Sequence, residues 1–368
     1  MPGILGELFI NLDLSSALQV VMLGFIGGTL SGFIGSGGAF FMTPGMMNLG
    51  VQGVVAVASN ITHKFGKAMV GSHKHGEMGN VDKKLALCLL LTAAAGIRLA
   101  VWVNSMLFES AAGKGAAKGA GSNLYISLVF VCILSLVAIS MLKDVLSKRE
   151  GDESGPSRKI SEALGRLRLP PTIHFKVADV KVSVWVLLVV GLATGYLAGT
   201  IGVGGFIGVP AMIYVFGIPT AVAAGTELYL AMFMGAFGAL NYAWAGYVDI
   251  RLTMLLYLGS LIGIHLGAYG VKVVNERYIR LVTGVIILLC VFSRGVAIPV
   301  YLRQLGMVGY DPAWDIYFEI ASKWLLFGSG IAGAGLILYH VMRAYFQRRR
   351  IKLAVMSEPA VATQPVSQ

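Results

Sequence analysis

Two glycine-rich stretches of this chain repeat each other at an offset of 167 residues. The first is GFIGGTLSGFIGSGGAFFMTP at 24–44, and the second is GLATGYLAGTIGVGGFIGVP at 191–210. The register continues beyond them, because GNVD at 79–82 returns as GYVD at 246–249. Paired apolar segments interrupted by glycine and proline predict a transporter built from two copies of one unit, with the substrate site at the breaks.

The composition places the chain in a membrane. It is 56% hydrophobic and 13% charged, with a mean hydropathy of +0.76, whereas soluble domains carry about 25% charged residues. No alternating pattern typical of a β-barrel occurs, so we expect an all-α polytopic membrane protein. Nine apolar runs are long enough to cross a hydrocarbon core, which takes about 20 residues: 16–35, 51–72, 85–108, 124–142, 183–201, 219–243, 252–272, 279–298 and 315–342. Two shorter apolar pieces follow the glycine breaks, at 39–49 and 206–217.

The distribution of basic residues predicts the topology. Of the 29 Lys and Arg residues, 22 lie in four stretches, at 64–84, 143–181, 272–280 and 343–352, which the positive-inside rule assigns to the cytoplasm. This assignment requires an even number of crossings at each glycine break, followed by three spans, so the second copy is inverted relative to the first. We therefore expect the N-terminus outside and the C-terminus in the cytoplasm. The net charge of +11 is then a topology signal rather than a sign of nucleic-acid binding.

The domain organisation follows from these runs. We expect two membrane repeats and one helix outside the duplication, with polar segments around them. The predicted parts are an N-terminal periplasmic or interfacial segment at 1–15, repeat one at 16–142, a cytoplasmic linker at 143–182, repeat two at 183–298, an additional transmembrane helix at 315–342 and a disordered cytoplasmic tail at 353–368. Within the repeats, glycines spaced by four residues, as at 24–32, 191–199 and 259–267, predict close helix packing.

The paired breaks resemble those of a known family. GSGG and GVGG, each followed by a proline and then by ASN at 58–60 or GTE at 225–227, are similar to the duplicated motif of the TauE/SafE anion permeases. The later G-x-V-D pair fits the same pattern, and the resemblance covers roughly 20–298. It implies secondary transport of sulfite and small organosulfonates across the bacterial inner membrane, with no prosthetic group and no catalytic reaction.

The breaks themselves are suited to an anion. Backbone inside a membrane must be hydrogen-bonded unless it is buried in protein or lines a cavity. A half-helix after each break offers free N–H groups and about half a positive charge, and glycine lets a small oxyanion approach them. We expect both ends to hold a sulfite or sulfonate head group; the alternative is a tight helix crossing without a ligand. The substrate-binding candidates are Gly35, Ser36, Gly37, Gly38, Ser59, Asn60, Gly202, Gly204, Gly205 and Thr226.

Three ionisable residues inside predicted spans are candidates for coupling or charge pairing, because such residues are costly in a membrane. Arg98 either adds positive potential to an anion path or forms a buried pair with Glu227. Glu227 departs from the apolar residue expected in the family at this position and is a candidate carrier of a coupling proton. His265 is either a coupling residue or, more commonly for such a residue, a helix-packing histidine.

Other functions fit the sequence less well. A membrane enzyme would need paired carboxylates within a span or an H-E-x-x-H motif, and neither occurs. His73, His75 and Glu77 are interpreted as a solvated face, so no metal and no cofactor are expected. A scaffold would have no use for the duplication, although a transporter of another small organic anion remains an alternative. We expect the partners to be a small anion and the lipid bilayer, with proton coupling and oligomeric state left open.

Overall fold

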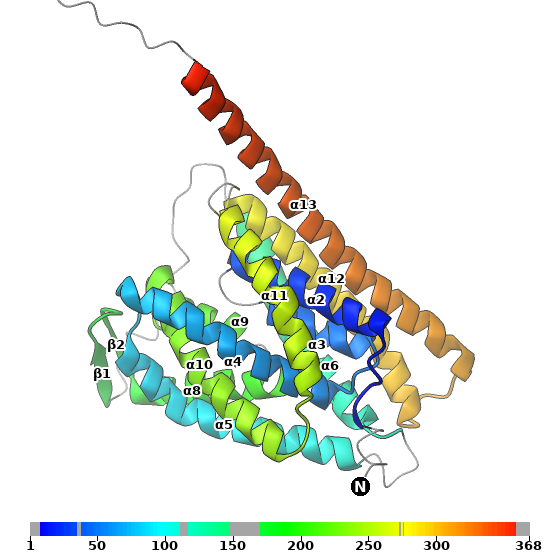
Figure 1. Ribbon diagram of the computed structural model, residues 1–368. Coiled ribbons are helices and arrows are strands. Elements are labelled where there is room, and N and C mark those ends of the chain that lie inside the picture. Colours follow the sequence, from blue (N-terminus) through cyan, green and yellow to red (C-terminus); the bar gives the residue numbers. More distant parts are fainter. Residues whose placement is uncertain are drawn as a thin grey trace, which may run out of the picture.

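The computed structural model describes residues 8–34, 38–110, 117–147, 170–202, 204–271, 274 and 276–357. It is a bundle of helices with one short β-hairpin (Figure 1). The elements are α2 (Leu14–Ile34), α3 (Ala39–Asn48), α4 (Gly53–Glu77), α5 (Lys83–Ser110), α6 (Ala120–Ser147), β1 (Thr172–Phe175), β2 (Val180–Ser183), α8 (Val184–Ile201), α9 (Gly205–Pro210), the π-helix η2 (Ala211–Val215), α10 (Thr220–Trp244), α11 (Ile250–Val271), α12 (Glu276–Gln304), the 3-10 helix η3 (Pro312–Trp314) and α13 (Asp315–Ser357).

Eight helices in the described part of the chain are long and apolar enough to cross a membrane: α2, α5, α6, α8, α10, α11, α12 and α13. The chain is therefore an all-α polytopic membrane protein, as predicted. The ninth predicted span, 51–72, falls on α4, which does not meet the same criterion. His63, Lys64 and Lys67 make this helix more polar than the others.

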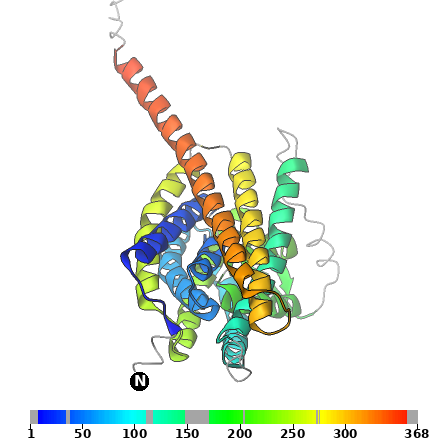
Figure 2. The same ribbon diagram turned by 90° about the vertical axis from the view of Figure 1, so that its right-hand side faces the viewer.

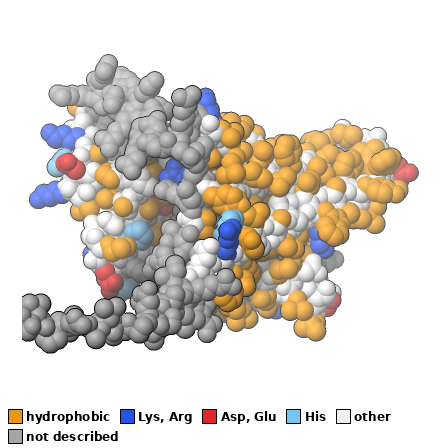
Figure 3. All heavy atoms as spheres, turned by 90° about the horizontal axis from the view of Figure 1, so that it is seen from above, with side chains coloured by type: hydrophobic (Ala, Val, Ile, Leu, Met, Phe, Trp, Pro, Cys, Tyr) orange, Lys and Arg blue, Asp and Glu red, His pale blue; other side chains and the backbone are white. Residues whose placement is uncertain are grey.

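Apolar side chains on the outside of the bundle suit a lipid environment. Leu91 is 78% exposed and Trp324 is 74% exposed, which would be unusual in a protein surrounded by water. Figure 3 shows hydrophobic side chains covering most of the right-hand part of the face in view, with charged groups scattered among them.

The two sequence copies fold into matching elements. The bounds of α4 and α10 lie 167 residues apart at both ends, and α5 and α11 begin 167 residues apart. The packing exchanges partners between the copies: α2 packs on α11, α8 on α5, α4 on α10 and α6 on α12. When each helix is replaced by its equivalent in the other copy, the pair α2–α11 becomes α8–α5. The pairs α4–α10 and α6–α12 stay the same. This pattern supports a two-fold relation between the copies.

Helices α4 and α10 run antiparallel. Gly71 lies against Leu228, whereas Gly235 lies against Phe65 nearer the start of α4. Because these helices are equivalent in the two copies, an antiparallel crossing is the arrangement expected of inverted copies. The orientation of each copy in the membrane stays a prediction.

The four-residue glycine spacing packs helix against helix. A Cβ on Gly28 would lie 2.6 Å from the Cα of Ser260 in α11, and a Cβ on Gly195 would lie 2.5 Å from the Cα of Ala93 in α5. These distances are too short for any larger residue without movement of the backbone. The packing interpretation of these glycine faces is thereby confirmed.

Two segments differ from the predicted boundaries. The linker contains the antiparallel hairpin β1–β2, whose strands are only four residues long and carry no strong sequence signal. The additional helix α13 extends to Ser357 and projects beyond the bundle (Figures 1 and 2), so the tail predicted to begin at 353 is helical over its first residues. The remaining tail, 358–368, and most of the linker lie outside the described residues.

Candidate functional site

Both glycine breaks end one helix and begin another. Helix α8 ends at Ile201, Gly202 takes the left-handed conformation with φ of 76°, and α9 follows with Gly204 as its N-cap and Gly205 as its first residue. The left-handed conformation favours glycine, which explains this residue at the break. In the first copy, Gly38 is the N-cap of α3. The predicted site residues Gly35, Ser36 and Gly37 lie outside the described residues.

The structure brings the two breaks together. The Thr43 hydroxyl on α3 donates to the carbonyl oxygen of Ile201 at 3.1 Å. The Asn60 amide nitrogen donates to the Thr43 hydroxyl at 2.8 Å and to the carbonyl oxygen of Ala39 at 3.0 Å. A Cβ on Gly202 would lie 3.0 Å from that amide nitrogen. Asn60, the first turns of α3 and the end of α8 therefore share one buried position.

The end of α8 is capped by side chains from three other helices. The last four carbonyl groups of a helix have no partner within it, so a buried helix end needs external donors. Here each of the four has one. The donors are the Gly202 amide to Ala198 at 2.9 Å, the Tyr242 hydroxyl to Gly199 at 2.7 Å, the Asn104 amide to Thr200 at 3.3 Å and the Thr43 hydroxyl to Ile201 at 3.1 Å. The break is thus held by α3, α5 and α10.

Lys64 lies at the break of the second copy. A Cβ on Gly204 would lie 3.2 Å from its ammonium nitrogen. Among the side chains that the structure describes, no carboxylate comes within 4.0 Å of this nitrogen. A positive charge at the start of α9 adds to the positive end of that helix.

Glu227 lies one turn further along the same half-helix. Its carboxyl packs directly against Gly208 of α9, where any Cβ would collide with it. The side chain is 2% exposed, and neither carboxyl oxygen has a hydrogen-bond partner within the described part of the chain. Lys64 is the charged group that acts on it electrostatically. A buried carboxyl without a hydrogen bond is costly, which favours a functional reason for keeping it.

The two copies differ in their chemistry at this point. Asn60 and Glu227 are equivalent positions at the 167-residue offset, while Lys64 is equivalent to Ala231. The first copy therefore supplies an amide and a cation, and the second supplies a carboxyl. The centre carries one ionisable group of each sign rather than two matching halves.

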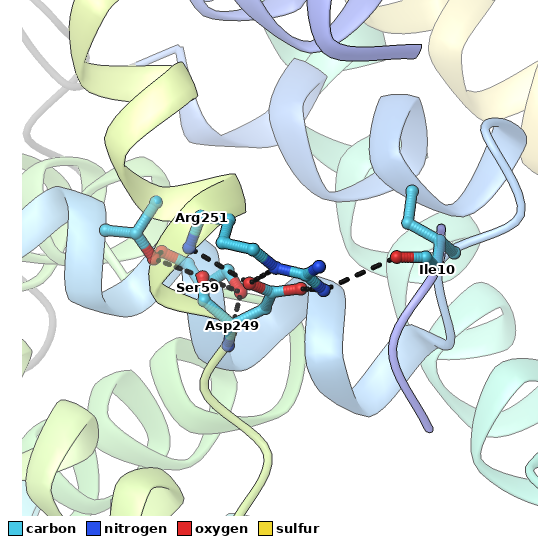
Figure 4. A network of polar contacts seen from close by, with 5 residues as sticks. Ile10, Ser59, Asp249 and Arg251 are labelled. Carbon is cyan, nitrogen blue, oxygen red and sulfur yellow. Dashed lines mark hydrogen bonds and ion pairs between the residues drawn. The ribbon is translucent and has the colours of Figure 1, made fainter. Parts of the chain in front are cut away.

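Ser59 and Thr226 join the copies to each other. The Thr226 hydroxyl accepts from the Asp82 amide at 3.0 Å, and the equivalent Ser59 hydroxyl accepts from the Asp249 amide at 3.3 Å. Figure 4 shows Ser59 directed at Asp249, whose carboxylate binds Arg251. Both hydroxyls accept these bonds, so each keeps an O–H group that can donate; the Ser59 O–H lies 3.4 Å from the carbonyl oxygen of Asp249. Their part in binding an anion stays a prediction.

Of the two alternatives for Arg98, the buried pair with Glu227 does not form in this structure. The Arg98 guanidinium is exposed and donates to the side-chain oxygen of Asn241 at 2.9 Å. Asn241 is 14 residues after Glu227 on α10, a distance of about 21 Å along the helix. The sequence does not reveal this separation, because it depends on the direction in which α5 crosses α10.

The histidines outside the centre have local roles. His265 is exposed, and its Nδ1 lies 2.7 Å from the carbonyl oxygen of Leu261 one turn earlier. It does not join Lys64 and Glu227 at the break. His73 pairs with Glu77 at 3.3 Å on an exposed surface, and the described residues contain no cluster of three metal-ligating side chains.

Sequence reasoning missed Lys64 and Thr43. Lys64 was counted as a basic residue near the cytoplasmic end of a span, yet it follows Asn60 by four residues and so shares its helix face. That spacing was the available signal. Thr43 lies next to the proline of the first break, but nothing in the sequence indicates that its partner is Ile201.

Comparisons with known proteins agree with this architecture. The family model described as sulfite exporter TauE/SafE matches residues 20–293. The probable membrane transporter protein YjnA of Bacillus subtilis is 23% identical over 274 residues, which are 74% of this chain and 97% of that protein. The probable membrane transporter protein YunE of the same organism is 24% identical, over 74% of this chain and 95% of that protein. A probable membrane transporter protein of Xylella fastidiosa is 24% identical, over 70% and 85%. No solved structure matches with significant similarity.

Proposed function

The chain belongs to the TauE/SafE family of membrane transporters, and we propose that it is a secondary transporter of a small sulfur-containing anion: sulfite, sulfate or an organosulfonate. We further propose that it lies in the inner membrane with its N-terminus outside and its C-terminus in the cytoplasm. It performs no catalytic reaction in this proposal.

The proposed anion site is the junction of the two glycine breaks. The start of α3 at Gly38 and the start of α9 at Gly204 and Gly205 provide backbone N–H groups. Asn60 holds the first of these helix starts. Glycine at 204 and 205 lets a small oxyanion come close to the backbone N–H groups, whereas at Gly38 the space of a side chain is filled by the backbone of Gly27.

Lys64 is the observation that carries the proposal. Its ammonium group is next to Gly204 and, among the described residues, has no carboxylate within 4.0 Å. Lys64 is partly buried, and a cation inside a membrane protein needs a counter-charge, because transfer from water to an apolar medium is costly. A bound anion at the break would supply that charge.

Glu227 gives the proposal a coupling mechanism. Its carboxylate and the anion would compete for the same cation, Lys64. Protonation of Glu227 removes this competition and strengthens anion binding, so a proton and an anion would move together. The buried, unbonded carboxyl supports this role.

Reconstituted vesicles test the proposal directly. Purified protein in proteoliposomes is given labelled sulfite, sulfate and small sulfonates under proton gradients of both signs. We expect saturable flux of at least one sulfur anion, driven by the gradient in the direction in which protons move. Glu227→Gln should transport without response to the gradient. Flux of carboxylates alone would favour another small organic anion, and no flux of any anion would exclude the proposal.

A further inference from the structure

Helix α13 lies beyond the family match, which ends at residue 293, and it contacts the half-helix of the first copy. A Cβ on Gly330 of α13 would collide with the ring of Phe41 in α3. Figures 1 and 2 show α13 running along the bundle beside α12. The contact with α3 therefore has no equivalent in the duplicated unit.

A polar cluster joins α13 to the C-terminal end of α3. The Ser322 hydroxyl on α13 lies 3.0 Å from the side-chain oxygen of Asn48 and 2.8 Å from the carbonyl oxygen of Ser293, and its one proton can go to either acceptor. The Asn48 amide donates in return to the Ser322 carbonyl oxygen at 3.1 Å and to the Ser293 hydroxyl at 3.1 Å. Asn48 is the last residue of α3, so these bonds fix the end of the half-helix.

Arg294 completes this cluster from α12. Among the residues that the structure describes, it is the largest fully buried side chain, 1% exposed. One terminal nitrogen lies 3.1 Å from the side-chain oxygen of Asn48 and 3.5 Å from the Pro44 carbonyl oxygen, and the other donates to the Tyr301 hydroxyl at 2.9 Å. No described carboxylate lies within 4.0 Å of it.

The charge of Arg294 lies at the C-terminal end of α3, because its guanidinium contacts Asn48, the last residue of that helix. The C-terminal end of a helix carries about half a negative charge, which partly cancels the positive end for a distant ligand. A cation at the C-terminal end offsets that negative charge. The positive end at Gly38 then acts on an anion without opposition from the other end.

We propose that Arg294 and Ser322 are positioning residues that hold α3 in place for the anion, and that α13 is thereby a working part of the site. This inference rests on the proposed function. The half-helix of the second copy has no equivalent of Arg294, because the equivalent position on α6 is Ser127. This half-helix continues instead as the π-helix η2, a geometry common at functional sites.

Hydrogen–deuterium exchange on the full-length protein in nanodiscs tests the positioning role without any substrate. The control is Ser329→Ala, because the Ser329 hydroxyl is on α13 and bonds only to Leu326 of its own helix. We expect the amides of α3 to exchange about fivefold faster in Ser322→Ala and Arg294→Gln, as for the loss of one hydrogen bond, and to be unchanged in the control. Equal exchange in all three variants overturns the proposal.

Transport kinetics separate the charge from the packing. Helix α3 is about 15 Å long, so losing a cation at its far end should raise KM for a monovalent anion about fivefold, with little change in kcat. Arg294→Lys, which keeps the charge, should restore most of that affinity. A KM equally raised in Arg294→Lys would contradict the electrostatic role. If the wild-type protein moves none of the anions, the proposed function fails, whereas the exchange measurement still decides the positioning role.

Discussion

The Thr43 hydroxyl donates a hydrogen bond to the carbonyl oxygen of Ile201, 158 residues later in the chain. Thr43 is on the half-helix of the first copy, and Ile201 ends the broken helix of the second. One side chain therefore places the two breaks against each other. This contact supports the proposal of a single shared site rather than two separate ones.

Removing that hydroxyl should destabilise the protein. Thr43→Val keeps the shape of the side chain but leaves the carbonyl group of Ile201 without its donor and the Asn60 amide without one of its acceptors. We expect a loss of about 1–3 kcal/mol in the free energy of unfolding, as for other buried groups that lose their partner. Thermal unfolding in detergent measures it, with Thr43→Ser as the matched control that retains the hydroxyl. Equal stability of both variants would show that the contact contributes nothing.

Neutralising Lys64 should weaken anion binding. In Lys64→Gln we expect KM for the transported anion to rise tenfold or more, since hydrogen bonds to charged groups contribute about 1.5–3 kcal/mol. Lys83→Gln is the control, because Lys83 is exposed at the start of α5. Flux and protein level in the membrane are measured together. A well-inserted Lys64→Gln with normal KM would remove this residue from the site.

Arg98 and Glu227 should act independently. Because their side chains lie far apart, the effects of Arg98→Gln and Glu227→Gln on stability should add in the double variant to within about 0.5 kcal/mol. Arg98→Gln alone should cost little, since its partner Asn241 is at an exposed position. Unfolding of the two single variants and the double variant gives the coupling energy. A double variant clearly more stable than the sum predicts would restore the charge pair.

The topology prediction can be checked with reporter fusions. Fusions within 143–181 and after the C-terminus should report the cytoplasm, and fusions within 111–122 should report the outside. Fewer basic residues now support the cytoplasmic position of 64–84, because Lys64 and Lys67 lie within α4 rather than in a loop. A cytoplasmic signal from 111–122 would refute the inverted arrangement.

Much of the fold could be predicted because apolar length and duplication are local properties of the sequence. The predicted span 85–108 corresponds to α5, and the 167-residue offset reappears in the bounds of α4 and α10. The extension of α13 past Lys352 was missed because the basic run at 343–352 was taken as the end of the helix, although the next four residues are apolar and the first proline, Pro359, follows the helix. The hairpin β1–β2 was missed because its strands are so short.

The candidate site was predicted only in outline. Glycine breaks identify where helices end, but the partners of each end come from other helices. Ser59 and Thr226 were predicted as donors to an anion, but the sequence does not indicate that their hydroxyls also accept from the backbone amides of Asp249 and Asp82. Lys64 has the right position, but its charge was explained by the cytoplasmic end of a span. That Lys64 of α4 lies beside Gly204 at the start of α9 follows only from how the helices pack in three dimensions.

The reciprocal contacts of Ser59 with Asp249 and of Thr226 with Asp82 also constrain how the chain is made. When the ribosome has completed the first copy, Asp82 has been synthesised but Thr226 has not. The contact of Asp82 with Thr226 therefore cannot form until the linker, α8 and the first turns of α10 have been synthesised. Insertion of the early helices and completion of their packing are therefore separate steps in the biogenesis of this protein.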